Sequence, residues 1–239
     1  MHGKLKAELR RSIQCAAGCD RPHPEKRFHK DAEYLSYGLV TPDFRRIMKE
    51  FRPQFLRLPL KERLGLASEL LSEHVGELGH AGIHVVGLST GELQPSHFPV
   101  LNRLHEDFRD WSQVDHFCGV VVQPLLWKHR DVVLALLNEW NRSSNRWKRR
   151  SSVVAFTRKV AESGLFTGHA LRLCENLLHD SEDIVRKGVG WALKDNLRSA
   201  PKPVLAFIKK ARRERVSSTI TLYAIRNLGK KARRSVLSL

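Results

Sequence analysis

Apolar residues recur at helical spacing from one end of this chain to the other, and alternation of apolar and polar residues at period two is nearly absent. The pattern therefore predicts an all-α fold. The predicted helices are Leu5–Ala16, Pro42–Glu50, Leu60–Ser72, Glu77–Val86, Gln94–Glu106, Trp111–Leu126, Asp131–Trp140, Arg146–Glu162, Gly168–Leu178, Asp183–Arg198, Pro203–Glu214 and Ser218–Lys230.

From Glu92 onward the predicted helices come in pairs, with corresponding points roughly 35 to 40 residues apart. Asp110, Asn145 and Ser181 mark such points, where a polar side chain can accept the free N–H groups of a first helical turn. This interval is typical of HEAT and armadillo repeats, which stack into a curved α-α superhelix (solenoid) whose concave face suits a long partner. We expect a single HEAT-like repeat domain over residues 1–239, with an N-terminal helical segment at 1–33.

Charge changes this picture, because 42 Lys and Arg stand against 25 Asp and Glu, a formal net charge of +17. A surplus of this size attracts polyanions, and nucleic acid is the first partner to consider. One basic cluster is most often a solvated helix face, but four in succession on stacked repeats favour a concave basic DNA-binding cleft. The clusters are Arg142, Arg146, Lys148–Arg150; Arg186, Lys187, Lys194; Lys209, Lys210, Arg212, Arg213, Arg215; and Arg226, Lys230, Lys231, Arg233, Arg234.

The N-terminus has no apolar signal-peptide core, and no apolar stretch approaches the roughly 18 residues that suggest a membrane span. With only four cysteines, we expect a reduced cytoplasmic protein, associated with the nucleoid through DNA binding and without a membrane partner. Solenoids with a DNA cleft can work as monomers, so we expect a monomer.

Residue types of a zinc site occur near the N-terminus at Cys15, Cys19, His23 and His29. Their spacing matches no common zinc finger, and Cys15 falls in a predicted helix. His80 and His84 are four apart but lack the adjacent Glu of the metalloprotease helix. We expect no metal and no cofactor.

Trp111 and Asp115 are four apart on one predicted helix and so share one face. Trp147 opens a helix one repeat later, and Lys187–Trp191 lies in a helix one repeat after that. A lone tryptophan is more often a core residue, and Asp115 could be a surface carboxylate or the partner of an arginine. The residues alone leave these interpretations open.

These segments resemble the signature segments of the DNA alkylation repair glycosylases of the AlkD type. They are Trp111-x-x-x-Asp115, Trp147-x-x-Arg150 and Lys187–Lys194, with supporting matches at Gly38–Arg46 and Glu77–Ala81. Their order and spacing hold from about Tyr34 to the C-terminus. The resemblance implies a HEAT-like solenoid that holds duplex DNA in a basic concave cleft and hydrolyses the N-glycosidic bond of alkylated purines.

The resemblance also implies roles for individual residues. Asp115 resembles the catalytic carboxylate, and Trp111 and Trp191 resemble aromatic walls beside the lesion nucleotide. Arg150 resembles the arginine that contacts the DNA backbone at the site. The further DNA-binding residues are Thr41, Arg45, Trp147, Lys148, Arg149, Lys187 and Lys194.

These residue types suit the reaction. A purine alkylated at N3 or N7 is cationic, so it leaves as a neutral base and needs no general acid. A fixed carboxylate stabilises the positive charge that develops on the sugar, which explains one Asp where ordinary glycoside hydrolysis uses a pair. We expect a glycosylase of base excision repair acting on 3-methyladenine and 7-methylguanine in double-stranded DNA.

Two alternatives stay open. The first is a non-catalytic HEAT-repeat protein that binds branched or distorted DNA, which is disfavoured because the positions of Asp115, Arg150 and both tryptophans are all filled. The second is a HEAT-type scaffold for an acidic protein partner.

Overall fold

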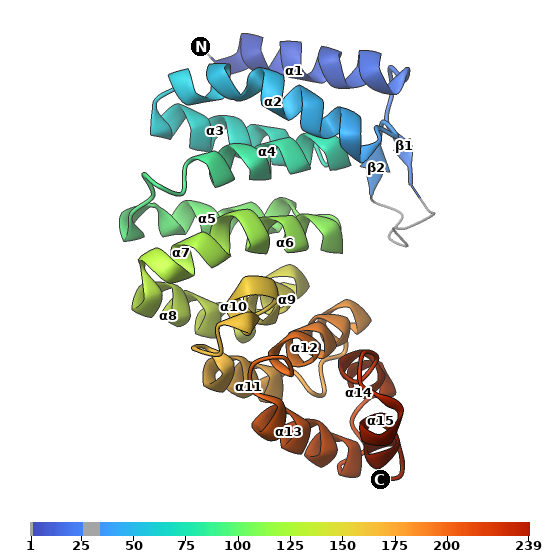
Figure 1. Cartoon of the computed structure of the whole chain (residues 1–239). Helices are drawn as coiled ribbons and strands as arrows, with labels where there is room; N and C mark the ends of the chain where they lie inside the picture. Colours follow the sequence, from blue (N-terminus) through green and yellow to red (C-terminus); the bar gives the residue numbers. More distant parts are fainter. Residues whose placement is uncertain (1, 26–33) are drawn as a thin grey trace. The chain divides into compact units, whose positions relative to one another are not determined.

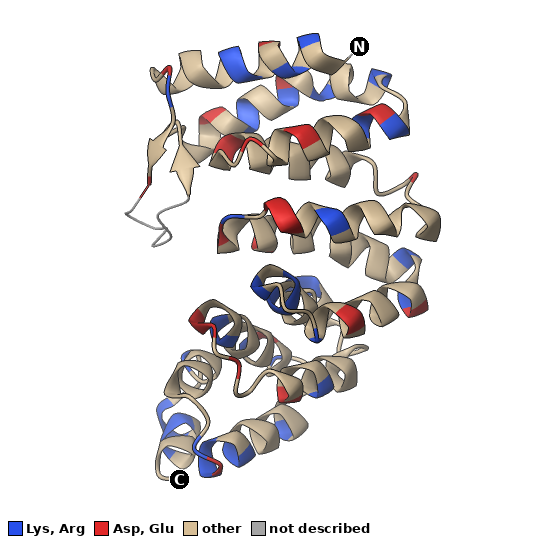
Figure 2. Ribbon diagram, turned by 180° about the vertical axis from the view of Figure 1, so that it is seen from behind, with Lys and Arg blue, Asp and Glu red and all other residues tan. Residues whose placement is uncertain are grey.

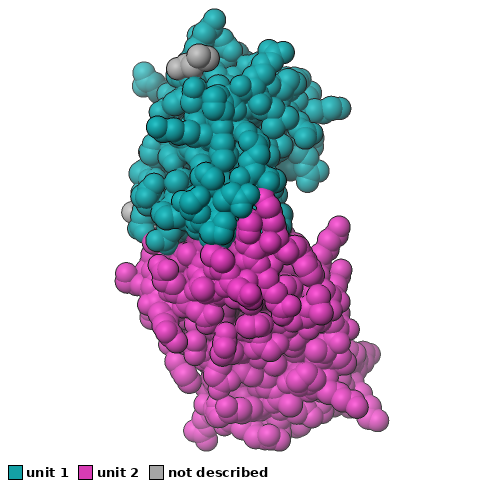
Figure 3. Space-filling view, turned by 90° about the vertical axis from the view of Figure 1, so that its left-hand side faces the viewer, with its two compact units in different colours: residues 1–125 teal, residues 126–239 magenta. Residues whose placement is uncertain are grey.

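Helices form nearly all the regular structure of the computed structural model, which describes residues 2–25 and 34–239 (Figure 1). The predicted all-α fold is confirmed. By internal contacts the chain divides into two compact units, unit 1 (Met1–Leu125) and unit 2 (Leu126–Leu239) (Figure 3). The single repeat domain over 1–239 stays a prediction. None of the helices among the described residues is both long and apolar enough to cross a membrane.

Unit 1 is a stack of helices with one short hairpin beside it (Figure 1). In the hairpin, β1 (His23–Pro24) pairs antiparallel with β2 (Leu35–Ser36). The helices are α1 (His2–Ala17), α2 (Thr41–Arg57), α3 (Leu60–Leu71), α4 (Gly76–Leu88), α5 (Phe98–Leu104) and α6 (Trp111–Phe117), followed by a π-helical turn, η3 (Cys118–Val122), and by α7 (Gln123–Lys128), within which unit 1 ends at Leu125. Short 3₁₀ turns, η1 (Pro95–His97) and η2 (His105–Asp107), flank α5.

Unit 2 is built around a central helix, α12, which packs against α9 and α14. Its core includes Trp140, Phe156 and Phe166, all fully buried. The helices are α8 (Arg130–Asn141), α9 (Arg146–Val154), α10 (Arg158–Glu162), α11 (Thr167–Asn176), α12 (Asp183–Asn196), α13 (Pro201–Arg213), α14 (Ser218–Ala224) and α15 (Lys230–Leu237).

Helix starts predicted from polar side chains are confirmed at two corresponding points. Asp110 Oδ1 accepts the Ser112 N–H at 2.6 Å at the start of α6. Asn145 Oδ1 accepts the Trp147 N–H at 2.8 Å at the start of α9. These caps fix where α6 and α9, two of the helices that carry predicted site residues, begin.

Several predicted helices differ from the structure. The predicted helix Pro42–Glu50 continues to Arg57 through Pro53, because burial of Phe51 and Phe55 keeps the chain helical. The predicted helix Arg146–Glu162 is divided between α9 and α10 at Arg158, whose φ is 55° and whose N–H is held by Asp195 Oδ2 at 2.9 Å. The predicted helix Ser218–Lys230 ends at Ala224, and α15 begins at Lys230.

Candidate functional site

The first turn of α6 carries Trp111 and Asp115 and is tightly held within unit 1. Gln113, which is buried, accepts the Arg109 N–H with Oε1 at 2.7 Å. Its amide nitrogen fills the space above Gly79 of α4, where a Cβ atom would lie only 2.3 Å away. Close approach of α4 to α6 therefore limits how far the Trp111–Asp115 turn can move.

Asp115 is buried, with 9% of its surface exposed, and lies just before the π-helical turn η3. Pro124 explains that turn, because proline has no N–H to bond the carbonyl four residues earlier and its ring crowds that carbonyl. π-helical turns of this kind are frequent at functional sites. The irregular backbone directly follows the turn that presents Asp115.

A cavity of about 1100 Å³ lies in unit 1 and brings three predicted site residues together: Trp111, Thr41 and Arg45. Asp115 is not among its lining residues, although it shares a helix face with Trp111. The other lining residues are Glu25, Tyr34, Ser36, Gly38, Leu39, Val40, Pro42, Phe44, Met48, Lys49, Arg52, Glu77, His80, His84, Leu88, Ser112 and His116.

Most of the residues that line this cavity were not predicted from the sequence. Lys49 and Arg52 lie on α2 beyond Arg45 and add positive charge to the cavity. Helical spacing along α2 is the signal that could have found them. Three histidines also line the cavity, and burial together with the nearby Arg52 guanidinium lowers the pKa of one of them, His84.

Glu77 holds the loop that leads into α2. Its carboxylate accepts the Ser36 hydroxyl at 2.7 Å and the backbone N–H groups of Tyr37 and Leu39, each at 3.1 Å. A carboxylate buried to this degree is stable only with such partners. Glu77 therefore places the start of α2, and with it Thr41, at the cavity; its segment had been noticed only as a supporting match.

In unit 2, Arg150 lies against α12. Its side chain is 4% exposed, and Nη1 donates to the Ile184 carbonyl at 2.6 Å. A Cβ atom on Gly188 would lie 3.3 Å from Arg150 Cγ and 3.4 Å from Nη1. The first glycine of the Lys187–Lys194 segment thus leaves room for the arginine.

The second glycine of that segment, Gly190, allows α12 to approach α14. A Cβ atom there would lie 2.7 Å from Tyr223 Cβ and 3.0 Å from the Ile220 carbonyl oxygen.

We expect Gly190→Ala to lower the free energy of unfolding by about 1–3 kcal/mol, because backbone must move to admit the methyl group. Gly188→Ala is the matched control and should cost less, since its nearest neighbours are side-chain atoms. Urea unfolding measures both, and equal values for the two variants would contradict this account.

Cations and aromatic rings alternate in a row next to Trp191. The Arg158 guanidinium lies 5.1 Å from the Trp191 ring centre, and Lys194 Nζ lies 5.9 Å from the rings of both Trp191 and Tyr223. The Arg226 guanidinium lies 4.1 Å from the Tyr223 ring. Lys194 Nζ also pairs with Asp195 at 3.0 Å. Arg158 and Tyr223 were not predicted, and Arg226 was noted only as part of a basic cluster, because tertiary packing brings all three to Trp191.

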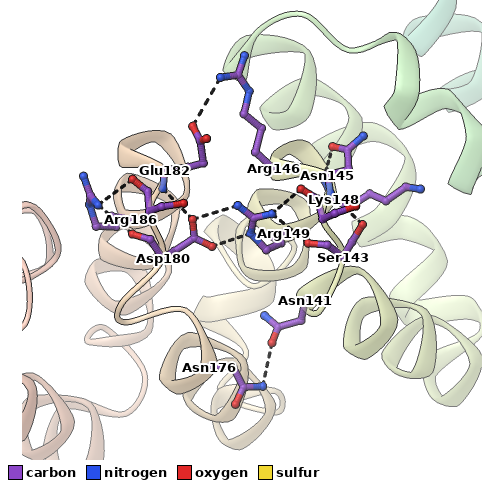
Figure 4. A network of polar contacts seen from close by, with 12 residues as sticks. Asn141, Ser143, Asn145, Arg146, Lys148, Arg149, Asn176, Asp180, Glu182 and Arg186 are labelled. Carbon is purple, nitrogen blue, oxygen red and sulfur yellow. Dashed lines mark hydrogen bonds and ion pairs between the residues drawn. The ribbon is translucent and has the colours of Figure 1, made fainter.

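Arg149 is the centre of a polar network at the start of α9 (Figure 4). Its Nε and Nη2 donate to Asp180 at 2.6 and 3.2 Å, and Nη1 donates to the Ser143 and Ser144 carbonyls. Asp180 also accepts the Glu182 N–H at 2.9 Å. The network therefore joins the start of α9 to the start of α12.

The other predicted DNA-binding residues of unit 2 lie in different surroundings. Trp147 is buried, and the Arg146 guanidinium lies 4.5 Å from its ring centre. Lys148 is half-buried, whereas Lys187 is exposed and pairs with Asp183 at 2.7 Å. Further Lys and Arg recur along α13 and α15 (Figure 2).

Within residues 2–25 and 34–239, no group of three or more His, Cys, Asp or Glu side chains is placed to hold a metal ion. Cys19 Sγ lies 3.9 Å from His23 Nδ1, and Cys15 is exposed. His29, which the sequence analysis considered with them, lies outside the described residues.

The fold is similar to two solved structures of DNA repair proteins. A predicted DNA alkylation repair enzyme from Enterococcus faecalis superposes with a TM-score of 0.74 at 12% identity, over 93% of this chain and 96% of that one. The Pseudomonas fluorescens alkylpurine DNA glycosylase AlkC, bound to DNA containing an abasic site analog, superposes with a TM-score of 0.60 at 18% identity, over 98% of this chain and 66% of that one.

Sequence comparison identifies the family. A search of curated proteins found no significant match. The family model described as DNA alkylation repair enzyme matches residues 16–228. This match spans both units and every predicted site residue. The chain belongs to the family of DNA alkylation repair enzymes.

Proposed function

We propose that this protein is a DNA glycosylase of the AlkD type that releases cationic alkylated purines, such as 3-methyladenine and 7-methylguanine, from double-stranded DNA. One observation carries the proposal: the turn of α6 that bears Trp111 and Asp115 is held rigidly by Asp110, Gln113 and the close approach of α4. The likeness to AlkC, an alkylpurine DNA glycosylase whose structure was solved with DNA containing an abasic site analog, supports the same class of chemistry.

Asp115 is the proposed catalytic carboxylate. As the bond to a cationic base breaks, positive charge grows on the sugar, and a carboxylate held in place needs no reorganisation to stabilise it. The base departs neutral, so no second carboxylate has to donate a proton. The proposed chemistry requires neither a metal nor a cofactor.

Trp111 and Trp191 are proposed to contact the damaged nucleotide. An indole face attracts a cation by about 0.5 to 2 kcal/mol, depending on desolvation. The Trp191 ring already lies next to the Arg158 guanidinium, 5.1 Å from the ring centre. A cationic purine is a group of the same charge and planarity, so it can take that place.

The proposed DNA contacts fall into two kinds. Thr41, Arg45 and Lys187 are exposed and can reach phosphates directly; Lys148, Lys194 and Arg150 are partly or fully buried, and we propose that they meet the backbone near the damaged nucleotide. The remaining two candidates, Trp147 and Arg149, are proposed to act by holding the start of α9, because the indole is buried and the guanidinium is bound to Asp180.

Single-turnover base release tests the proposal. Matched duplexes carrying 7-methylguanine, 3-methyladenine or uracil are incubated with excess protein, and the free base is separated and measured. We expect release of both alkylated purines and none of uracil, because uracil is neutral when bound and would have to leave as an anion without help. Binding to the alkylated duplexes without release would instead favour the non-catalytic DNA-binding alternative.

Salt dependence of DNA affinity tests the contact set. Each phosphate contact releases counterion, so log K should fall with log salt by about 0.9 per contact. We expect a slope equivalent to about five contacts. Fluorescence anisotropy on an undamaged duplex measures it, and a slope near one contact would exclude an extended basic DNA-binding surface.

A further inference from the structure

His80 of α4 uses both ring nitrogens to hold α6. Its Nε2 lies 3.1 Å from Ser112 Oγ, and its Nδ1 lies 3.1 Å from Nδ1 of His116. Ser112 and His116 are one helical turn apart, and they directly follow Trp111 and Asp115 in the sequence. We call these three residues, His80, Ser112 and His116, the histidine cluster. It spans the whole turn that presents the proposed catalytic carboxylate.

We propose that His80 is a positioning residue for Asp115, and that a proton shared between His80 and His116 makes this positioning depend on pH. The inference rests on the proposed glycosylase function. His80 does not touch the reacting atoms in this scheme. It acts by limiting the movement of α6 against α4.

The 3.1 Å distance between the two Nδ1 atoms is the basis for the shared proton. Two imidazole nitrogens 3.1 Å apart form a hydrogen bond only when one carries hydrogen and the other offers a lone pair. With one proton between the two Nδ1 atoms, His80 Nε2 remains free to bond the Ser112 hydroxyl. When both rings are protonated, both Nδ1 atoms carry hydrogen and two like charges face each other, so the bond is lost.

Charged groups of both signs surround the histidine cluster. From α2, Phe44 contacts the His80 ring edge-on at 6.3 Å between centres. Other titratable groups line the same cavity: Arg45, Lys49 and Arg52 from α2, Glu77 and His84 from α4, Tyr34 and Glu25 from the hairpin segment. Asp115 lies on the same α6 turn as the cluster. The Glu77 carboxylate is bound to the loop before α2, and burial raises the pKa of Tyr34, which keeps its phenol neutral.

The first test separates rate from affinity. We expect His80→Ala to lower the single-turnover rate of 7-methylguanine release about tenfold or more, since small displacements of a reacting group are costly. DNA affinity should stay within about twofold. His74→Ala is the matched control, because His74 bonds Asp107 and Arg109, which precede α6 in unit 1. A native rate in His80→Ala, or an equal loss in His74→Ala, would overturn the proposal.

The second test uses pH and guards against simple loss of folding. His116→Asn places an amide close to the position of Nδ1 and takes up no proton. We expect this variant to keep a rate close to native at about pH 8 and to hold that rate toward about pH 5, where the native rate falls. Parallel pH profiles for the two proteins would refute the shared proton.

Histidine NMR of the DNA-free protein makes the two proposals separable. We expect the His80 and His116 ring nitrogens to titrate as a coupled pair, assigned by comparison with His80→Ala and His116→Asn. Independent single-step titrations of the two histidines would contradict the inference even if the protein releases alkylated purines. Coupled titration with no base release by the native protein would instead count against the proposed glycosylase function alone.

Discussion

Asp115→Asn is expected to reduce release of 7-methylguanine and 3-methyladenine by about 10²–10³-fold, to the limit of detection, while DNA affinity stays unchanged or rises slightly. Asparagine keeps the shape of the side chain but removes the negative charge that is proposed to face the sugar cation. Removing a carboxylate from a basic DNA-binding surface also lessens repulsion of phosphate. Single-turnover release and duplex binding, measured in parallel, check both parts.

Asp110→Asn is the matched control for this prediction. It removes a buried carboxylate near the same turn, yet asparagine caps a helix as well as aspartate, so the bond to the Ser112 N–H is retained. We expect its excision rate to stay close to native. Native-level excision by Asp115→Asn, or efficient uracil release by the native protein, would contradict the mechanism.

Asp180→Ala is expected to lower the free energy of unfolding by about 3–5 kcal/mol. The Arg149 side chain is 15% exposed and that of Asp180 5%, so the variant leaves a largely buried guanidinium without its carboxylate. The Glu182 N–H at the start of α12 also loses its acceptor. Urea unfolding followed by circular dichroism measures the loss.

Two further variants make this result specific. Asp183→Ala breaks an exposed pair with Lys187, both side chains being nearly half exposed, and should cost at most about 1 kcal/mol. Adding Arg149→Met to Asp180→Ala removes the stranded charge, so the double variant should be more stable than the sum of the two single losses predicts. Strict additivity, or equal losses for Asp180→Ala and Asp183→Ala, would show that the buried pair has no special weight.

Local features of the chain were enough to predict the helices of the candidate site. Asn145 caps α9 as expected from its side chain, and the apolar stripe over Trp111–Leu126 correctly predicted a continuous helical stretch. The π-helical turn within it was not predicted, although Pro124 was visible in the sequence. Its form depends on how the freed carbonyl is accommodated, which spacing alone does not reveal.

Contacts between helices were much harder to predict. From its spacing, His80 was grouped with His84 on the same helix, whereas the structure shows it bonded to Ser112 and His116 on α6. Arg149 was expected to bind DNA, but Asp180, which is 31 residues away, occupies its guanidinium. In both cases the partner comes from a distant segment that no local pattern marks.

The order of residues along the chain was sufficient for the all-α fold and for the starts of α6 and α9, because helical periodicity and capping involve atoms within a few residues of one another. Burial of Arg150, the cavity beside Trp111 and the histidine cluster depended on how the helices pack. Packing distance and rotation are set by side chains on several helices at once, as the missing Cβ atoms of Gly79 and Gly188 illustrate.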